Sequence, residues 1–100
     1  MRRERVDQVT VEGMDGLVLD YYMTIDEASV CEPFGISIVK RCETDMMEEY
    51  ASIDHIGADR QEICRLIDRL AKGKTFPVSL NEIVDDYLAM YDLEIKEERK

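Results

Sequence analysis

Hydrophobic residues recur with a helical period in the second half of the chain. Over residues 60–72 they stand three or four positions apart, which is the spacing of a buried helix face. This face comprises Ile63, Leu66, Ile67, Leu70 and Ala71. Asp59 with Glu62 three positions later is a capping signal for the helix start, and Gly73 is expected to end the helix as a left-handed residue. We therefore expect Leu66 and Leu70 to be buried against a β-sheet formed by the first half of the chain.

A second helix is predicted over about residues 80–91. Its apolar face comprises Leu80, Ile83, Val84, Tyr87, Leu88 and Tyr91. Before it, Pro77 disfavours the α region for the preceding residue, so residues 75–78 are expected to be extended. The second half of the chain therefore reads as a helix, an extended connector and a second helix.

The start of this second helix carries two local signals. Ser79 and Glu82 have the spacing of a capping box. Val78 and Ile83 flank the box at the positions of a hydrophobic staple. Together they predict that Ser79 caps the helix.

Alternating hydrophobic and polar positions in the first half of the chain predict β-strands. The clearest alternation lies over residues 17–25, with Leu17, Leu19, Tyr21, Met23 and Ile25 on one face. Residues 34–42 alternate as well, and Gly35 within them indicates a bulge or a close backbone approach. A weaker strand is expected over residues 5–12, followed by a glycine-containing turn at 13–16. These segments predict an antiparallel hairpin and a third strand.

Residues 43–56 fit two interpretations. A strand would place Met47, Ala51 and Ile53 on one face, whereas a helix would place Met46, Met47, Tyr50 and Ile53 on one stripe. We favour the strand because residues 50–53 follow a turn of hairpin length.

These elements predict an α+β fold, with a three- or four-stranded antiparallel meander packed on one face by two C-terminal helices. We expect a single domain over residues 1–100, with strands within 5–56, helices at about 60–72 and 80–91, and a charged tail at 94–100. The sequence shows no signal peptide and no apolar run of about 18 residues, so a cytoplasmic protein is expected.

The chain is acidic, with a formal net charge of −10. Residues 75–94 contain five acids and no base. Such a chain should be repelled by nucleic acid and by anionic membranes, so we expect direct binding to neither. The sequence contains no glycine-rich phosphate loop or other cofactor motif, and no cofactor is predicted.

Few residues suggest chemistry. His55 follows Asp54, but neighbouring residues in a strand point to opposite faces, so a surface histidine is expected rather than an oriented general base. The carboxylate pairs Asp26–Glu27, Glu48–Glu49 and Asp85–Asp86 lack the spacing of calcium or magnesium sites, and no metal is predicted. The cysteines, Cys31, Cys42 and Cys64, cannot all pair with one another and are expected to be thiols in a reducing compartment.

Three stretches carry a resemblance to known sequences. They are Leu19-Asp20-Tyr21-Tyr22, the five residues 34–38 (FGISI) and the twelve residues 77–88 (PVSLNEIVDDYL). In these the chain resembles a family of short uncharacterised proteins from Gram-positive anaerobic bacteria, known only as a domain of unknown function. The resemblance implies strands followed by helices and a cytoplasmic bacterial setting. It implies no activity, so no functional residue is carried over.

One side of the second helix is entirely acidic and is the most distinctive candidate site. It comprises Glu82, Asp85, Asp86 and Asp92, with no base nearby in the sequence. Glu82 and Asp86 stand four residues apart, where like charges cost about 0.2–0.5 kcal/mol. The plain interpretation is a solvated polar face. The functional interpretation is a surface that binds a protein with a cationic face.

Three classes of function follow from these patterns. The first is a non-enzymatic protein-interaction or regulatory module, because no catalytic constellation is present in the sequence. The second is an inhibitor that mimics nucleic acid and occupies the cationic groove of a nucleic-acid-binding protein, as counter-defence proteins of phages do. The third is an enzyme, resting only on His55 and the carboxylates. The partner is unassigned, and a homodimer is compatible with the sequence.

Overall fold

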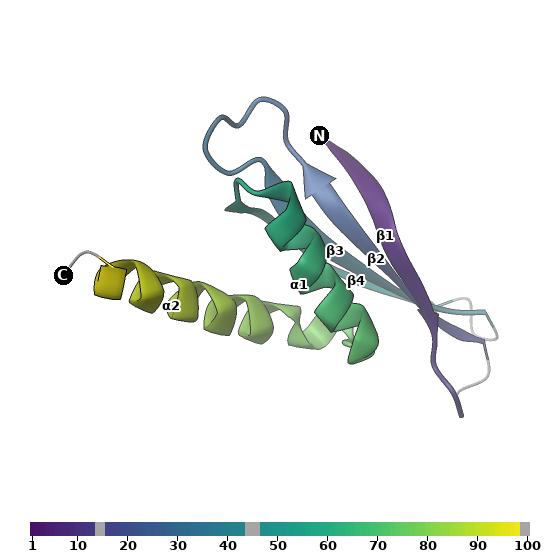
Figure 1. Ribbon diagram of the computed structural model, residues 1–100. Coiled ribbons are helices and arrows are strands. Elements are labelled where there is room, and N and C mark those ends of the chain that lie inside the picture. The colour runs from purple at the N-terminus through teal and green to yellow at the C-terminus, as the bar shows by residue number, and fades with distance from the viewer. Residues whose placement is uncertain (14–15, 44–46, 99–100) are drawn as a thin grey trace.

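A computed structural model shows a four-stranded antiparallel sheet in the order β1-β2-β3-β4, followed by helices (Figure 1). The strands are β1 (Arg2–Thr10), β2 (Leu17–Ile25), β3 (Phe34–Cys42) and β4 (Met47–Gly57). The structure describes residues 1–13, 16–43 and 47–98, and side chains as far as residue 90. Each strand pairs with the next along the chain, so the sheet is a meander.

The strand predictions are largely confirmed. β2 and β3 have the predicted bounds, whereas β1 begins three residues earlier than predicted and ends two residues earlier. The ambiguous segment is strand β4, as favoured. Its pairing with β3 sets Ala51 opposite Ile38 and Ile53 opposite Ile36, which brings apolar residues together on one face. The helical alternative is wrong, because Met47, Tyr50 and Ile53 all lie in this strand, where Tyr50 is 73% exposed.

Three helical segments follow the sheet: α1 (Arg60–Lys72), the short 3₁₀ helix η1 (Pro77–Ser79) and α2 (Leu80–Glu98). α1 lies across one face of the sheet, whereas α2 leaves the sheet and projects away from it (Figure 1). The predicted α+β class, with two C-terminal helices on an antiparallel meander, is thereby confirmed.

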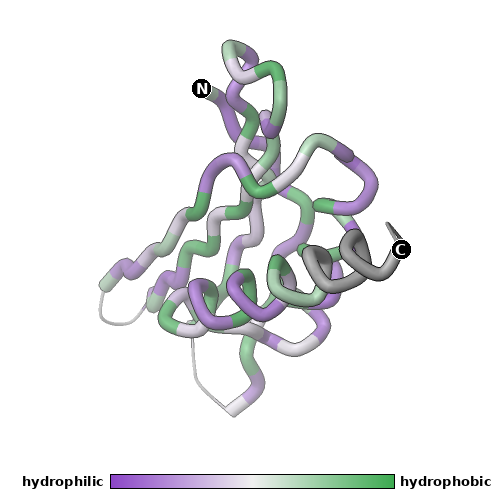
Figure 2. Tube along the Cα trace, turned by 90° about the vertical axis from the view of Figure 1, so that its left-hand side faces the viewer, coloured by the Kyte–Doolittle hydropathy of each residue, from purple (hydrophilic) through white to green (hydrophobic). Residues whose placement is uncertain are grey.

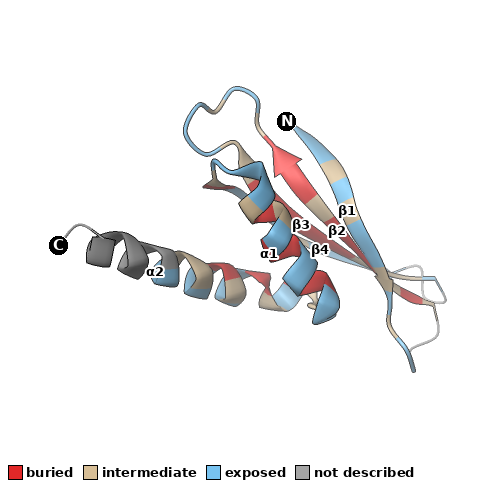
Figure 3. Ribbon diagram, in the orientation of Figure 1, coloured by how far each residue is buried: buried red, intermediate tan, exposed pale blue. Residues whose placement is uncertain are grey.

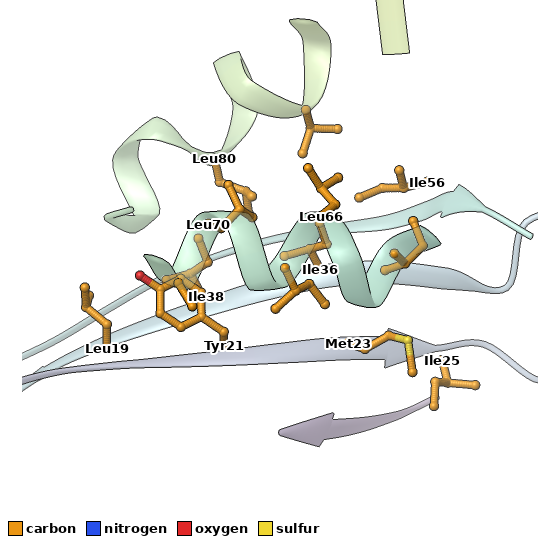
Figure 4. Packing of buried hydrophobic residues seen from close by; sticks show 14 residues of the cluster. Leu19, Tyr21, Met23, Ile25, Ile36, Ile38, Ile56, Leu66, Leu70 and Leu80 are labelled. Carbon is orange, nitrogen blue, oxygen red and sulfur yellow. The ribbon is translucent and has the colours of Figure 1, made fainter. Parts of the chain in front are cut away.

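The core lies between the sheet and α1. Green and purple segments alternate along the strands in Figure 2, and this alternation gives each strand one apolar face. The buried residues from the strands are Leu19, Tyr21, Met23, Ile25, Ile36, Ile38 and Ile56. Those from the helices are Ile63, Leu66, Ile67, Leu70, Ala71, Leu80 and Val84. Figure 4 shows Leu66 and Leu70 among the strand residues, which confirms their predicted burial.

The predicted start of α1 is confirmed, but its end differs from the prediction. The Asp59 carboxylate accepts the backbone N–H of Gln61 at 2.9 Å, as an N-cap residue does. Gly73 has φ −84°, so it is not the left-handed residue, and Lys74 takes that conformation with φ 51°. The N–H of Lys74 donates to the carbonyl of Ala71, and the N–H of Thr75 donates to the carbonyl of Leu70. This is a Schellman motif displaced by one residue.

The predicted start of α2 is wrong in two respects. Phe76 is extended, with φ −86° and ψ 156°, but Pro77 and Val78 are not, because a 3₁₀ helix already begins at Pro77. Proline has the φ of a first helical residue, which explains the early start. Ser79 lies inside this 3₁₀ turn and makes no capping bond with another described residue. Val78 is 82% exposed, so it does not pack as a staple.

Gly35 marks a close approach of two strands, as its position in β3 indicated. The β3–β4 register shifts between Phe34 and Ile36, beside this glycine. A Cβ atom on Gly35 would overlap the backbone carbonyl oxygen of Ile53 and the hydroxyl of Thr24. Only glycine therefore fits against β4 at this position.

Candidate interaction surface

The predicted acidic side of α2 is exposed in the structure. Glu82, Asp85 and Asp86 are all exposed and form no ion pair with any other described side chain. Asp92 lies outside the residues whose side chains are described. The bases of α1 do not neutralise this side within the described residues, since Lys72 pairs with Asp68 of its own helix. The acidic charge of α2 is therefore balanced by solvent in this part of the chain.

The first turns of α2 divide these acids into two rows. A residue and its fourth neighbour share one side of a helix. Asp85 therefore follows Asn81 along one side, whereas Asp86 follows Glu82 along another. Leu80 and Val84 are fully buried in the core. These two residues therefore set which side of α2 faces the core. Figure 3 shows red segments at the start of α2 and pale blue ones along the same turns.

A groove of about 560 Å³ lies between the outer edge of β4 and the η1–α2 junction. We call it the edge groove. Its lining residues are Glu48, Glu49, Tyr50, Ala51, Pro77, Val78 and Asn81. Glu48 and Asn81 line the same groove, so the groove joins the outer edge of β4 to the first turn of α2, next to Glu82 in the sequence. We define the acidic surface as Glu48, Glu82, Asp85 and Asp86. Sequence reasoning missed Glu48 because only the fold brings β4 beside α2.

The two neighbouring glutamates of β4 have different environments. Glu49 shares the helix-bearing face with Ala51 and pairs with Lys40, whose Nζ lies 3.1 Å from its carboxylate. Lys40 also lies 5.2 Å from the centre of the Phe76 ring, a cation–π contact. By strand alternation Glu48 belongs to the opposite face, but β4 is the edge strand and Glu48 also lines the edge groove; it has no ion pair with a described residue. Strand alternation thus leaves one of the two charges unbalanced.

The face of the sheet opposite the helices holds a buried carboxylate that sequence reasoning did not single out. Asp20 is 2% exposed, although it lies in the most apolar strand. Its Oδ2 accepts the Nε–H of Arg41 at 2.8 Å and lies 2.8 Å from Nη2 of the same guanidinium, and its Oδ1 accepts the side-chain amide of Gln8 at 2.7 Å. A buried carboxylate needs such partners to offset its desolvation. This arrangement ties β1, β2 and β3 together.

His55 is a surface residue, as predicted, but its partner is not Asp54. Its Nε2 lies 2.8 Å from a carboxylate oxygen of Asp26, which comes from the loop between β2 and β3. This hydrogen bond, together with that from the backbone N–H of Ala28, lowers the pKa of Asp26. His55 itself has φ 60°, a left-handed conformation in which it can turn toward this loop. The pair joins two chain segments at the surface.

The other candidate chemistry is dispersed over the molecule. No group of three or more histidine, cysteine or acidic side chains within the described residues could hold a metal ion. No disulfide joins Cys31, Cys42 and Cys64, which all lie in the described part of the chain. Among the residues described, no helix is both long and apolar enough to cross a membrane.

The chain belongs to a family of unknown function, DUF6514, whose family model matches residues 3–90. That range covers β1 from its second residue, β2, β3, β4, α1 and the part of α2 whose side chains are described. No curated protein and no solved structure matches the chain. The family therefore brings no activity, and any function has to be argued from the surface itself.

Proposed function

We propose that this protein is a non-enzymatic interaction module that binds a protein partner with a cationic surface. The observation that carries the proposal is the acidic surface, whose carboxylates are exposed and without an ion pair among the described residues. Elsewhere, carboxylates such as Glu4, Asp20 and Glu49 do meet a base of the chain. The acidic surface therefore has no evident task in holding the fold together.

Electrostatics give this surface a simple mode of action. Glu82 and Asp86 repel each other at a cost of about 0.2–0.5 kcal/mol, and a cationic partner would relieve that repulsion. Opposite potentials also accelerate encounter and disfavour acidic partners. The net charge of −10 adds to this attraction. A cytoplasmic bacterial setting, which the resemblance implies, belongs to the same proposal.

A mimic of nucleic acid is the alternative within the same electrostatic logic. The same unpaired carboxylates could occupy a groove that normally holds phosphates. The two functions differ in the identity of the partner. A mimic binds a nucleic-acid-binding protein, and duplex DNA or RNA competes with it for that protein.

Affinity capture with matched variants tests the proposal. The variant Asp85→Lys with Asp86→Lys reverses two charges of the acidic surface. The control Glu12→Lys with Glu32→Lys makes the same change in net charge at two exposed acids that are not part of that surface. Proteins from a bacterial lysate are captured at about 0.15 M salt and again at about 0.5 M salt, where screening is stronger.

We expect a partner that the wild type and the control retain at low salt, that the acidic-surface variant loses, and that high salt releases. Retention by the folded acidic-surface variant would overturn the proposal. Release of the partner by added duplex DNA would favour the nucleic-acid mimic.

A further inference from the structure

We propose that the outer edge of β4 receives an extended segment of the partner as a fifth strand, and that this segment alternates basic and apolar residues. The inference rests on the proposed function, because it assigns the partner's binding mode at the same surface. It starts from the free edge of the sheet, the edge groove beside it and the distribution of charge around both.

β4 is an open edge in the described part of the chain. It pairs only with β3, so alternate backbone N–H and C=O groups along its other side have no strand partner. From Met47 to Ile53 the ladder runs without a register shift, which keeps this edge regular over seven residues. Such an edge is a template for an added strand, with main-chain hydrogen bonds supplying affinity.

The opposite edge of the sheet is less suited to this role. β1 carries a register shift between Arg5 and Asp7, and irregularities of this kind discourage strand addition. Three arginines lie along its first half, and an ion pair of Glu4 with Arg60 ties this strand to α1. A cationic partner would be repelled from β1 and attracted to β4.

The two faces of β4 specify the side chains of the added strand. On the face away from the helices, Glu48 and Asp54 are exposed and have no ion pair with another described residue. On the other face, Ala51 lines the edge groove together with Val78, which is 82% exposed. An added strand lies about 4.8 Å from β4 with its side chains alternating between these faces. Basic residues would therefore meet the carboxylates, and the residues between them would meet Val78.

A second copy of the chain fits this edge poorly. β4 contains no lysine or arginine, so pairing of two β4 strands would align acidic strands against each other. Like charges across a strand pair are destabilising. Charge complementarity therefore selects a basic segment of another protein.

The test uses two labelled peptides with the same composition. One has four Lys-Val repeats, and the other has four lysines followed by four valines, which removes the alternation. Binding is measured by fluorescence anisotropy at about 0.15 M salt. The protein variants are Val78→Lys, beside the edge groove, and Val30→Lys, at a valine that is 94% exposed and lies in the loop between β2 and β3.

We expect the alternating peptide to bind the wild type at least about tenfold more tightly than the block peptide, because only the alternating peptide can add as a strand. We also expect Val78→Lys to weaken the alternating peptide at least about tenfold by placing a positive charge beside the incoming strand, while Val30→Lys leaves binding unchanged. Amide hydrogen exchange should slow in β4 when this peptide binds.

Three results would overturn the inference. Equal affinity of the two peptides, with both lost in Asp85→Lys with Asp86→Lys, would leave the acidic surface as a binding site but exclude strand addition. Equal effects of Val78→Lys and Val30→Lys would show that charge alone decides binding. Absence of binding by either peptide would reject the edge groove as a site, and the capture experiment would then decide separately whether the acidic surface binds a partner.

Discussion

The two helices of this protein stand in different relations to the fold. α1 places a continuous apolar side on the sheet, is capped by Asp59, and has ion pairs through Arg60 and Lys72. The first turns of α2 pack against the core through Leu80 and Val84. The helix then projects away from the sheet (Figure 1). Its described acids have no ion pair with another described residue.

Residues that pack, cap or pair within the chain stabilise the fold. The exposed acids of α2 do none of these among the described residues. In α1 the apolar side is explained by packing, the first turn by the Asp59 cap, and Arg60 and Lys72 by ion pairs. The exposed Arg65 and Arg69 have no ion pair with another described residue. In α2 the same explanations cover the buried residues but not the exposed acids. The exposed acids of α2 and the β4 edge beside them are therefore candidates for binding a partner.

The largest expected effect concerns the packing of α1. Replacing Leu66 by alanine should lower the free energy of unfolding by about 2–5 kcal/mol, because a buried leucine leaves a cavity. A urea titration of wild type and variant measures the change. A loss below about 0.5 kcal/mol, typical of surface positions, would show that α1 does not pack as described.

The buried Tyr21, whose hydroxyl bonds the connector between the helices, should make the free energy of unfolding fall at alkaline pH. Burial raises the pKa of Tyr21 to about 12, with Asp7 adding to the effect, and its hydroxyl donates to the backbone carbonyl of Thr75 at 2.8 Å. The unfolded tyrosine ionises near pH 10, so this stabilisation is complete below pH 10 and is lost as the pH rises toward 12. The loss should be on the order of 2 kcal/mol.

Urea titrations of wild type and Tyr21→Phe across this pH range isolate the contribution of Tyr21. The phenylalanine variant should lack this component of the pH dependence. An identical decline in both proteins would mean that other groups cause it.

The starts of the two helices should respond differently to the loss of a side-chain oxygen. Asp59→Ala should lower the free energy of unfolding by about 0.5–2 kcal/mol, because it removes the acceptor for the first turn of α1. Thermal or urea unfolding of this variant checks the value. An unchanged stability would show that the capping bond contributes nothing in solution.

At the start of α2, Ser79→Ala should change the free energy of unfolding by less than about 0.5 kcal/mol. The serine lies within a helical turn that begins at Pro77, and the first turn does not depend on its hydroxyl. A loss as large as that of Asp59→Ala in the same assay would restore Ser79 as a cap.

The smallest expected effect concerns the acids of α2. Asp85→Lys with Asp86→Lys should leave the free energy of unfolding unchanged or raise it by a few tenths of a kcal/mol, about 0.2–0.5, since a repulsive pair disappears. Glu12→Lys with Glu32→Lys is the matched control for net charge. A loss of several kcal/mol in the first variant alone would assign these carboxylates to internal pairing.

Much of the fold could be predicted from the sequence because its hydrophobic periods are clear. β2, β3 and α1 follow from alternation or from three- and four-residue spacing, and Gly35 was identified as a close approach. The errors lie at helix ends, where two neighbouring residues could each end or begin the helix. Lys74 rather than Gly73 is left-handed, and Pro77 starts a helical turn before Ser79.

The candidate site was only partly predictable. The exposure of Glu82, Asp85 and Asp86 follows from their places on an amphipathic helix. The contribution of Glu48 depends on which strand lies beside α2, and local pattern does not contain that information. Asp20 was also missed, although a lone acid in an apolar strand is itself a signal of a buried ion pair.

The central claim is that the acidic surface, rather than the whole acidic chain, attracts a cationic partner. Titration of tetralysine into the ¹⁵N-labelled protein, followed by amide chemical shifts, tests it most directly. The account predicts that shifts concentrate at Glu48, Glu82, Asp85 and Asp86 and vanish in the Asp85→Lys with Asp86→Lys variant. Equal shifts at Glu12 and Glu32, two exposed acids that are not part of the acidic surface, would contradict it, because they would show attraction to net charge alone.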